Sequence, residues 1–411
     1  MRIAIVGGGA AGFFGAITCA KANPRNEIVI FERSSQPLQK VRISGGGRCN
    51  VTHAMFEPRE VTTRYPRGGR ELIASFHRFG TAETVAWFEH RGVRLKTEAD
   101  GRMFPMTDSS DTVVDCLIRE AQRAGVKLFT RRGAESVERA GDSFLLRLTD
   151  DESFTCDRLL LATGGARNQT GAKLAQALGH AIEPPVPSLF SFESEAGWMR
   201  HLAGISVADA QLSIADARLV ERGPVLITHR GVSGPAVLRL SAWGARELHE
   251  RGYQFTLRLN WLPAMTTEEI TAEFQTQRAA HPNRLVVNSA LAGVPARLWE
   301  QLALRSGILA ETRWTSLRHA AANALMGLLT RTEIAIDGKS LNKDEFVTCG
   351  GVRLREVDFK TMESRITRGL YFGGELLDID GITGGFNFQS AWTTGWMAGN
   401  AMARAGAPRT I

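Results

Sequence analysis

The sequence predicts an α/β protein in which both ends of the chain build one domain and the middle forms a second. Residues 3–6 are a short β-branched run that leads into a glycine-rich turn and a helix of small residues, and residues 27–32 form the next strand. Residues 159–165 and 369–385 each contain a further buried strand followed by glycines. The predicted fold class is therefore α/β, with a parallel, Rossmann-type sheet interrupted by an insertion.

The composition changes along the chain in a way that suggests domain boundaries. Pro184-Pro185-Val186-Pro187 is the clearest linker, and short strands such as 211–214 and 255–259 follow it. Ala, Leu, Glu, Gln and Arg then dominate a helical stretch. We therefore expect a discontinuous first domain, 1–187 with 346–411, and an inserted domain, 188–345, made of a β-barrel and a helical subdomain at about 266–330.

The net charge is mildly positive. The 411 residues include 50 Lys and Arg against 43 Asp and Glu, which gives a formal net charge of +7. The excess is carried largely by scattered arginines such as Arg64, Arg67 and Arg70, and it forms no Lys-rich tail. This charge permits an anionic partner, while an ordinary solvated basic surface is the slightly favoured interpretation.

Cysteine usage and hydropathy favour a cytoplasmic protein. The five cysteines are far apart in the sequence and include no Cys-x-x-Cys pair, which argues against a disulfide framework or a zinc ribbon. No run reaches the roughly 18 apolar residues of a membrane span. We therefore expect neither membrane insertion nor a bound metal.

The first glycine-rich turn has the spacing of a dinucleotide-binding motif, Gly7-x-Gly9-x-x-Gly12. The first glycine permits a tight turn, the second lets a diphosphate approach the backbone, and the third allows close helix packing. An acid follows 20 residues after Gly12, where it can accept hydrogen bonds from an adenosine ribose. The predicted contacts are Gly7, Gly9, Ala11, Gly12, Glu32 and Arg33.

Two later segments, 159–165 and 369–389, favour FAD over NAD. A strand that ends in Gly-Gly-Glu, as 370–375 does, can place an acid beside a ribityl hydroxyl. The helix after residue 385 can direct its positive end at the flavin pyrimidine. Either segment alone would also fit an ordinary strand, turn and helix. Together with the first motif they predict an FAD site that includes Thr163, Gly164, Gly165, Gly374, Glu375, Asp378, Gly385, Phe386 and Asn387.

These motifs resemble those of a bacterial flavoprotein family, the YhiN/BaiN-like proteins, also described as aminoacetone-oxidase-type enzymes. The resemblance covers nearly the whole chain and rests in addition on 43–52 (ISGGGRCNVT), 228–235 (THRGVSGP), 347–352 (VTCGGV) and 361–364 (TMES). His53 and Cys349 depart from it, since Asn and a small residue such as Ala are expected there. The resemblance implies a glutathione-reductase-like FAD domain with an inserted β-barrel and helical domain.

The segment 44–50 offers further cofactor contacts. It is predicted to be a turn of backbone N–H groups, suited to a diphosphate or to the flavin ring. A purely structural loop is the alternative. The residues added to the predicted FAD site are Ser44, Gly45, Gly46, Gly47, Arg48 and Asn50.

Three side chains are candidates for catalysis. Cys49 can protonate a carbon that receives hydride if its thiol lies near the flavin. His229 and Arg230 can act as a proton donor or an anion clamp from the inserted domain. The alternatives are a packed thiol in the loop and a buried, hydrogen-bonded histidine.

The resemblance implies reduction of an activated C=C bond, either of uridine in ribosomal RNA to dihydrouridine or of a conjugated oxo-steroid. NADPH or NADH would be the electron donor and would dock at the flavin, since the sequence has no second Gly-x-Gly-x-x-Gly motif between the FAD segments. The basic charge favours the RNA substrate. The alternatives are an oxidase of a small amine or aminoketone and, least favoured, a flavin-bearing RNA-binding protein without turnover.

Overall fold

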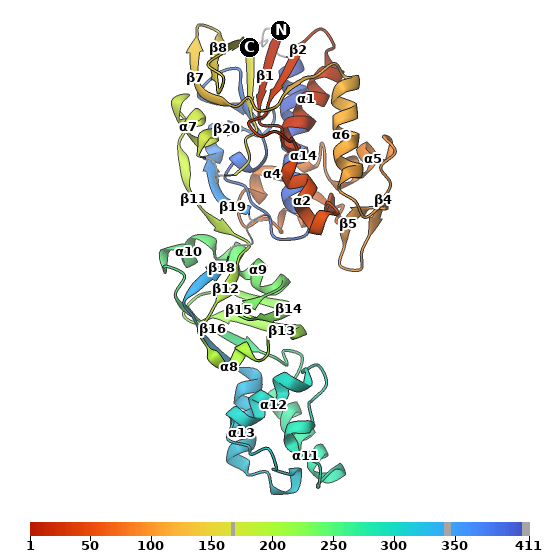
Figure 1. The fold of residues 1–411 in the computed structure, drawn as a ribbon, viewed down its shortest axis with the longest axis vertical. Helices are drawn as coiled ribbons and strands as arrows, with labels where there is room; N and C mark the ends of the chain where they lie inside the picture. Colours follow the sequence, from red (N-terminus) through yellow and green to blue (C-terminus); the bar gives the residue numbers. More distant parts are fainter. Residues whose placement is uncertain (166–168, 341–346, 405–411) are drawn as a thin grey trace. The chain divides into compact units, whose positions relative to one another are not determined.

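The computed structural model describes residues 1–165, 169–340 and 347–404. The chain divides into two compact units, which Figure 1 traces in sequence colours. The first unit is Met1–Pro187 with Lys343–Ile411, and the second is Ser188–Asn342. The domain boundary predicted at 345/346 lies outside the described residues.

A seven-stranded sheet forms the centre of the first unit, in the order β20-β21-β22-β10-β1-β2-β6. The five strands from β22 to β6 are parallel. Residues 3–6 are buried, as expected for a central parallel strand covered on both faces. The sheet confirms the predicted Rossmann-type α/β fold. Its strands are β1 (Arg2–Val6), β2 (Glu27–Phe31), β6 (Lys127–Phe129), β10 (Arg158–Leu161), β20 (Val357–Asp358), β21 (Glu363–Ser364) and β22 (Leu370–Phe372).

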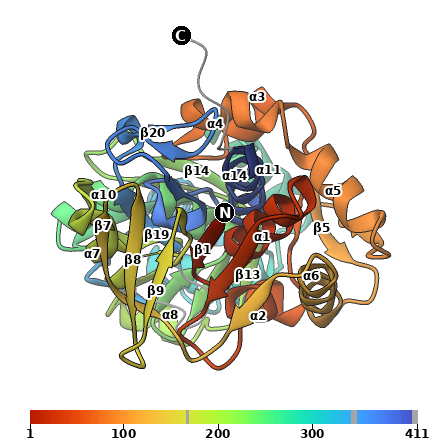
Figure 2. The same ribbon diagram turned by 90° about the horizontal axis from the view of Figure 1, so that it is seen from above.

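Three helices lie together beside this sheet: α1 (Ala10–Ala22), α6 (Asp111–Arg123) and α14 (Phe386–Arg404). Figures 1 and 2 both show α14 alongside α1. A Cβ on Gly395 would lie 2.4 Å from the carbonyl oxygen of Ala11, and a Cβ on Gly399 would lie 2.5 Å from that of Gly15. Because these glycines let the two backbones touch, the last helix packs directly against the first βαβ unit.

The remaining elements of the first unit surround this core. A β-meander, β7 (Ala134–Ala140), β8 (Ser143–Leu148) and β9 (Ser153–Cys156), contacts β1 and β10. The segment 69–89 forms two helices, which Gly80 separates. A Cβ on Gly80 would lie 2.6 Å from the Phe76 carbonyl oxygen, so the tight turn between the helices favours glycine. The other elements are α2 (Gln39–Gly47), β3 (Thr52–His53), α3 (Pro58–Thr62), α4 (Gly69–Phe76), α5 (Thr81–Glu89), β4 (Leu95–Thr97), β5 (Arg102–Pro105), α7 (Thr170–Ala177), η3 (Leu354–Glu356) and η4 (Gly374–Leu376).

The proline-rich segment interpreted as a linker is a strand. It forms β11 (Ile182–Ser188), which pairs with β19 (Val347–Val352) in a two-stranded ribbon. Each strand of such a ribbon has one edge free of ladder hydrogen bonds, so prolines without an N–H are tolerated there.

The second unit holds an antiparallel seven-stranded sheet, in the order β17-β16-β13-β14-β15-β12-β18, and a helical part. Its core includes three fully buried tryptophans, Trp261, Trp299 and Trp314. Among the described residues, no helix is both long and apolar enough to cross a membrane. The elements are β12 (Ser191–Glu193), α8 (Gly197–Arg200), β13 (Ser206–Ile214), β14 (Val220–Thr228), β15 (Gly231–Ser233), α9 (Pro235–Trp243), α10 (Ala245–Glu250), β16 (Phe255–Asn260), α11 (Thr267–Ala280), η1 (Val286–Asn288), α12 (Ala296–Arg305), η2 (Trp314–Ser316), α13 (His319–Thr330), β17 (Thr332–Ile336) and β18 (Gly338–Ser340).

Candidate cofactor and active site

The turn between β1 and α1 has two packed glycines and one open glycine. A Cβ on Gly7 would lie 2.3 Å from the Ala162 carbonyl oxygen, and a Cβ on Gly12 would lie 2.0 Å from the Gly7 carbonyl oxygen. A Cβ on Gly9, by contrast, would meet nothing within 4 Å. Gly9 also precedes the first turn of α1, whose backbone N–H groups carry the positive end of the helix dipole. Open space over these N–H groups is what the diphosphate of a dinucleotide requires.

Glu32 follows β2 and its carboxylate is held by backbone donors. The Gly8 N–H donates to Oε2 at 2.8 Å, and the Ser34 N–H donates to Oε1 at 2.7 Å. The carboxylate therefore lies against the glycine-rich turn, as expected of an acid that accepts ribose hydroxyls. The neighbouring Arg33 donates instead to the Thr170 hydroxyl at 3.1 Å.

The segment from residue 44 to 50 is a left-handed turn after the regular part of α2. Gly45, Gly46 and Gly47 have φ angles of 58°, 69° and 84°, and Cys49 has a φ of 62°. A Cβ on Gly46 or Gly47 would meet nothing within 4 Å, so this backbone faces open space. The Ser44 hydroxyl donates to the Val41 carbonyl oxygen at 3.1 Å.

Arg48 points its guanidinium at the protein and not at the open side of this turn. It donates to Glu98 at 2.6 Å and lies 4.0 Å from the centre of the Phe104 ring. These contacts raise the pKa of Arg48, chiefly through the Glu98 hydrogen bond. The open glycine backbone, more than the Arg48 charge, is therefore the part of this turn suited to a cofactor.

Asn50 joins this turn to the start of α14. With its amide oriented to satisfy both neighbours, it donates to the Thr52 carbonyl oxygen and accepts from the Gly385 N–H, each at 2.9 Å. The Trp392 indole N–H donates to the Val51 carbonyl oxygen at 3.0 Å. Residues 50–51 and the start of α14, which are more than 300 positions apart in the sequence, therefore pack against each other.

The start of α14 is itself fixed by side chains. Both groups of the Asn387 amide pair with the Gly381 backbone at 2.8 Å, and the Tyr65 hydroxyl donates to the Phe386 carbonyl oxygen at 2.6 Å. The His53 ring stacks on the Phe386 ring with centroids 4.9 Å apart. These contacts hold the helix N-terminus in place, where its N–H groups can face an electron-rich ring edge.

Glu375 lies against the predicted cofactor turn at Gly165 and also contacts Thr348 and Lys40. Its Oε1 accepts the Thr348 N–H at 2.9 Å, and a Cβ on Gly165 would lie 2.7 Å from the same oxygen. Its Oε2 pairs with Lys40 at 2.5 Å. Sequence reasoning did not find Lys40, since a lone lysine 335 positions from its partner gives no local signal.

Beside Glu375, the Thr163-Gly164-Gly165 turn ends β10. Gly164 has a φ of 76°, and a Cβ there would meet nothing within 4 Å. Thr163 carries a buried hydroxyl oxygen with no hydrogen-bond partner in the part of the chain that the structure describes. A buried polar atom of this kind is expected where a ligand or water completes the bonding. A Cβ on the adjoining Gly374 would lie 3.0 Å from the Ala11 Cβ, so Ala11 packs closely against this turn.

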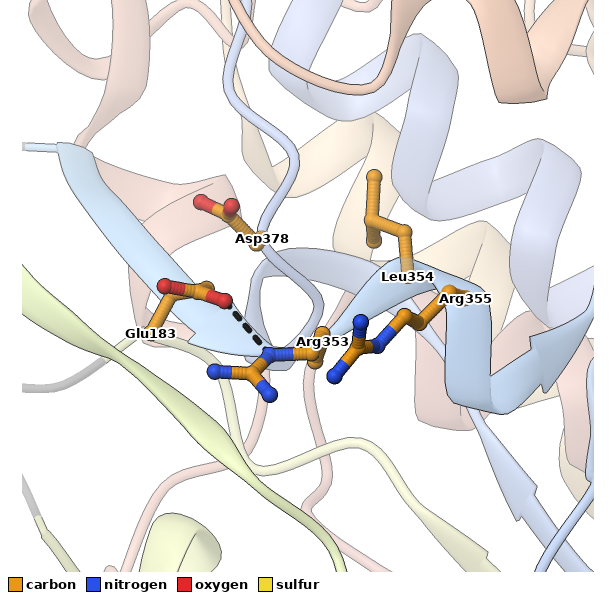
Figure 3. Close-up of a pocket in the computed structure, with 5 residues that line it drawn as sticks. All are labelled: Glu183, Arg353, Leu354, Arg355 and Asp378. Atoms are coloured by element: carbon orange, nitrogen blue, oxygen red, sulfur yellow. Dashed lines mark hydrogen bonds and ion pairs between the residues drawn. The ribbon is translucent and has the colours of Figure 1, made fainter.

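A cavity of about 530 Å³ opens beside Asp378, an acid of the C-terminal motif. Figure 3 shows Arg353 and Arg355 next to one another on the same side of it, and Arg353 donates to Glu183 at 2.6 Å. The cavity therefore carries both signs of charge. Its lining residues Glu183, Arg353, Leu354 and Arg355 were not predicted as site residues, because nothing in their local sequence distinguishes them from surface residues.

Cys49 is fully buried, with 0% of its surface exposed. Burial raises the pKa of its thiol to about 12. Such a thiol stays protonated at neutral pH but releases its proton reluctantly. The structure thus gives this side chain the environment of a packing residue.

His229 and Arg230 lie in the second unit, in the turn between β14 and β15, and both are exposed. Arg230 pairs with Glu193 at 3.1 Å. His229 therefore has the solvent accessibility that Cys49 lacks.

The sequence matches a known protein family over nearly its whole length. The model of the HI0933-like protein Rossmann domain matches residues 1–401. This chain belongs to the HI0933-like family. The match confirms the resemblance predicted from the motifs, and it identifies the chain as an FAD-dependent oxidoreductase with a Rossmann-type domain.

Two curated relatives are equally similar to this member of the HI0933-like family. The 3-dehydro-bile acid delta(4,6)-reductase of Clostridium scindens is 31% identical over 98% of this chain and 99% of its own. The ribosomal RNA dihydrouridine synthase of Escherichia coli is 31% identical over 95% of both chains. Among solved structures, the 3-ketosteroid-delta4-(5alpha)-dehydrogenase of Rhodococcus jostii superposes with a TM-score of 0.52 at 13% identity, covering 98% of this chain and 96% of its own, which shows a shared fold.

Proposed function

We propose that this protein uses NADPH or NADH to reduce an activated C=C bond, and that its substrate is uridine in ribosomal RNA. The observation that carries the proposal is the chemistry shared by the two relatives, whose names describe different substrates but the same kind of step. In both, two hydrogens add across a C=C bond conjugated to a carbonyl group. Bound FAD would supply hydride from N5 for such a step.

The residues of the first unit fit the binding of FAD. The open backbone at Gly9 and the first turn of α1 would receive the diphosphate, and Glu32 would accept a ribose hydroxyl. Glu375 would accept a ribityl hydroxyl, and the fixed start of α14 would direct its N–H groups at the pyrimidine edge of the flavin. The open glycines at 46 and 47 leave room for the ring.

Proton delivery is assigned to the exposed pair in the second unit. His229 would protonate the carbon next to the one that receives hydride, and Arg230 would contact an anionic group of the substrate. Cys49 is the other candidate, and its burial argues against direct contact with a substrate. Exchange of His229 for Gln should therefore reduce turnover while FAD remains bound.

RNA is favoured over a steroid by the charge of the chain. A formal net charge of +7 attracts a polyanion and adds little to the binding of a single carboxylate. The steroid relative, at the same identity as the RNA relative, makes a conjugated oxo-steroid the second candidate.

The direct test is product analysis. The FAD-loaded protein is incubated with NADPH or NADH and with ribosomal RNA from cells that lack the protein, and the nucleosides are analysed by mass spectrometry. We expect a uridine that gains two mass units. A parallel reaction with a 3-oxo-Δ4,6 steroid separates the alternative, because reduction of the steroid without any change in RNA would contradict the proposed substrate.

A further inference from the structure

Lys40 lies at a point where three predicted cofactor segments meet. It is the second residue of α2, and the Leu38 N–H two positions earlier donates to the Gly8 carbonyl oxygen at 2.8 Å. The lysine is thereby carried by a segment that touches the glycine-rich turn directly. On its other side, the Lys40 ammonium pairs with Glu375.

The surroundings give this cation a specific place. Glu375 also receives the Thr348 N–H and lies against Gly165, so the ammonium reaches the corner between β10, β19 and η4. Neighbouring cations point elsewhere, because Arg42 pairs with Asp111 and Arg48 pairs with Glu98. Lys40 is thus the cation of this segment that pairs with the predicted ribityl acid, and the backbone just before its helix contacts the glycine-rich turn.

The side chain also has freedom to serve both neighbours. It is 56% exposed, whereas its partner Glu375 is 16% exposed. A lysine carries a compact charge on a flexible stem with three donors, so one ammonium can contact a carboxylate and a phosphate oxygen together. The turn itself supplies backbone N–H groups and a helix dipole, which are partial charges, while a diphosphate brings full negative charge.

We propose that Lys40 binds the diphosphate of FAD and holds Glu375 toward the ribityl chain. This assignment rests on the proposed use of FAD. It makes Lys40 a charge-selective cofactor contact that distinguishes FAD from flavins without a diphosphate.

The test compares FAD with riboflavin, which has the same flavin ring and ribityl chain but lacks the adenosine diphosphate. Flavin-free protein is titrated with FAD and, separately, with riboflavin, and dissociation constants are read from flavin fluorescence at two salt concentrations. The variants are Lys40→Met, Lys40→Arg and the control Lys127→Met. Lys127 is 60% exposed and pairs with Glu27 in the same unit, so its exchange removes the same charge from a comparable ion pair away from the predicted cofactor contacts.

The Lys40→Met variant should bind FAD about 10- to 100-fold more weakly than the wild type, because it loses one charge-assisted contact. The dissociation constant of the variant for FAD should also depend less on salt concentration. Riboflavin binding should change less than about threefold, and Lys40→Arg and Lys127→Met should stay near wild type for FAD. Equal losses for FAD and riboflavin would show a structural role and overturn the inference, as would an unchanged FAD dissociation constant in Lys40→Met. Wild-type protein that binds no FAD would instead overturn the proposed cofactor itself.

Discussion

The glycine-rich turn yields a prediction that separates folding from cofactor binding, because two of its glycines differ in what surrounds them. Gly9→Ala places a methyl group in open space, at a backbone conformation of φ −95° and ψ −168° that alanine adopts readily. Gly12→Ala places the same methyl group 2.0 Å from a backbone carbonyl oxygen. The first change should therefore leave the fold intact, and the second should not.

The magnitudes follow from these contacts. Alanine at position 9 gains about 0.4–1 kcal/mol from the unfolded chain and loses a similar amount as a poorer helix N-cap than glycine, so the free energy of unfolding should stay within about 1 kcal/mol of wild type. Overpacking against rigid backbone at position 12 should cost about 3 kcal/mol or more. The Gly9→Ala methyl group displaces the diphosphate from at least one N–H donor, which should weaken FAD binding about 10- to 100-fold.

Urea unfolding of the flavin-free proteins and FAD titration provide the two readings. The reasoning predicts a stable Gly9→Ala protein with weak FAD binding and a destabilised Gly12→Ala protein. A Gly9→Ala variant that binds FAD as tightly as wild type would refute the placement of the diphosphate. A Gly9→Ala variant as unstable as Gly12→Ala would refute the steric argument.

Three further predictions concern single side chains. Cys49→Ala should keep FAD and, since the thiol is buried with a pKa of about 12, should turn over at the wild-type rate; a loss of turnover with FAD bound would restore the thiol as the acid. Burial, opposed by the Asp100 carbonyl and aided by the Arg64 charge, lowers the pKa of His53 below its usual 6.5, so the folded state binds this proton less readily than the unfolded chain. The free energy of unfolding should therefore fall as the pH drops below about 6.5. Measured by urea unfolding, it should fall less steeply with decreasing pH in His53→Asn than in the wild-type protein. Equal slopes in the two proteins would count against the effect. Arg230→Ala should raise the KM for RNA more than it changes the rate of flavin reduction, which stopped-flow and steady-state assays measure separately; an unchanged KM would exclude the anion contact.

Local patterns account for the parts of the fold that the sequence predicts. The packing of Gly12 on the Gly7 carbonyl oxygen and the hydrogen bond from Gly8 to Glu32 lie within one βαβ unit, so the spacing of these residues is visible in the sequence. The glycines before α14 are also visible in the sequence, because they directly precede a continuous helical pattern. Sequence motifs therefore predict best the positions of residues whose contacts lie close to them in the sequence.

Contacts between distant segments could not be predicted in this way. Arg48 turns to Glu98, which is 50 positions away, and the Lys40–Glu375 pair spans 335 positions. Neither pairing is visible in the local sequence, because the residues that flank a single charged residue are the same whether or not it has a distant partner. The β11 strand was missed for a related reason, since its prolines fit a linker by composition and fit a two-stranded ribbon only once β19 is present.

In the proposed reaction, this chain passes electrons from a nicotinamide through FAD to a C=C bond in RNA. Anaerobic stopped-flow mixing of the FAD-loaded protein with NADPH or NADH, followed by ribosomal RNA in one portion and oxygen in another, tests it most directly. The account predicts that nicotinamide bleaches the flavin absorbance, that RNA restores it quickly and that oxygen restores it slowly. A flavin that nicotinamide leaves oxidised, but that an amine bleaches and oxygen rapidly restores, would contradict the account and favour an oxidase.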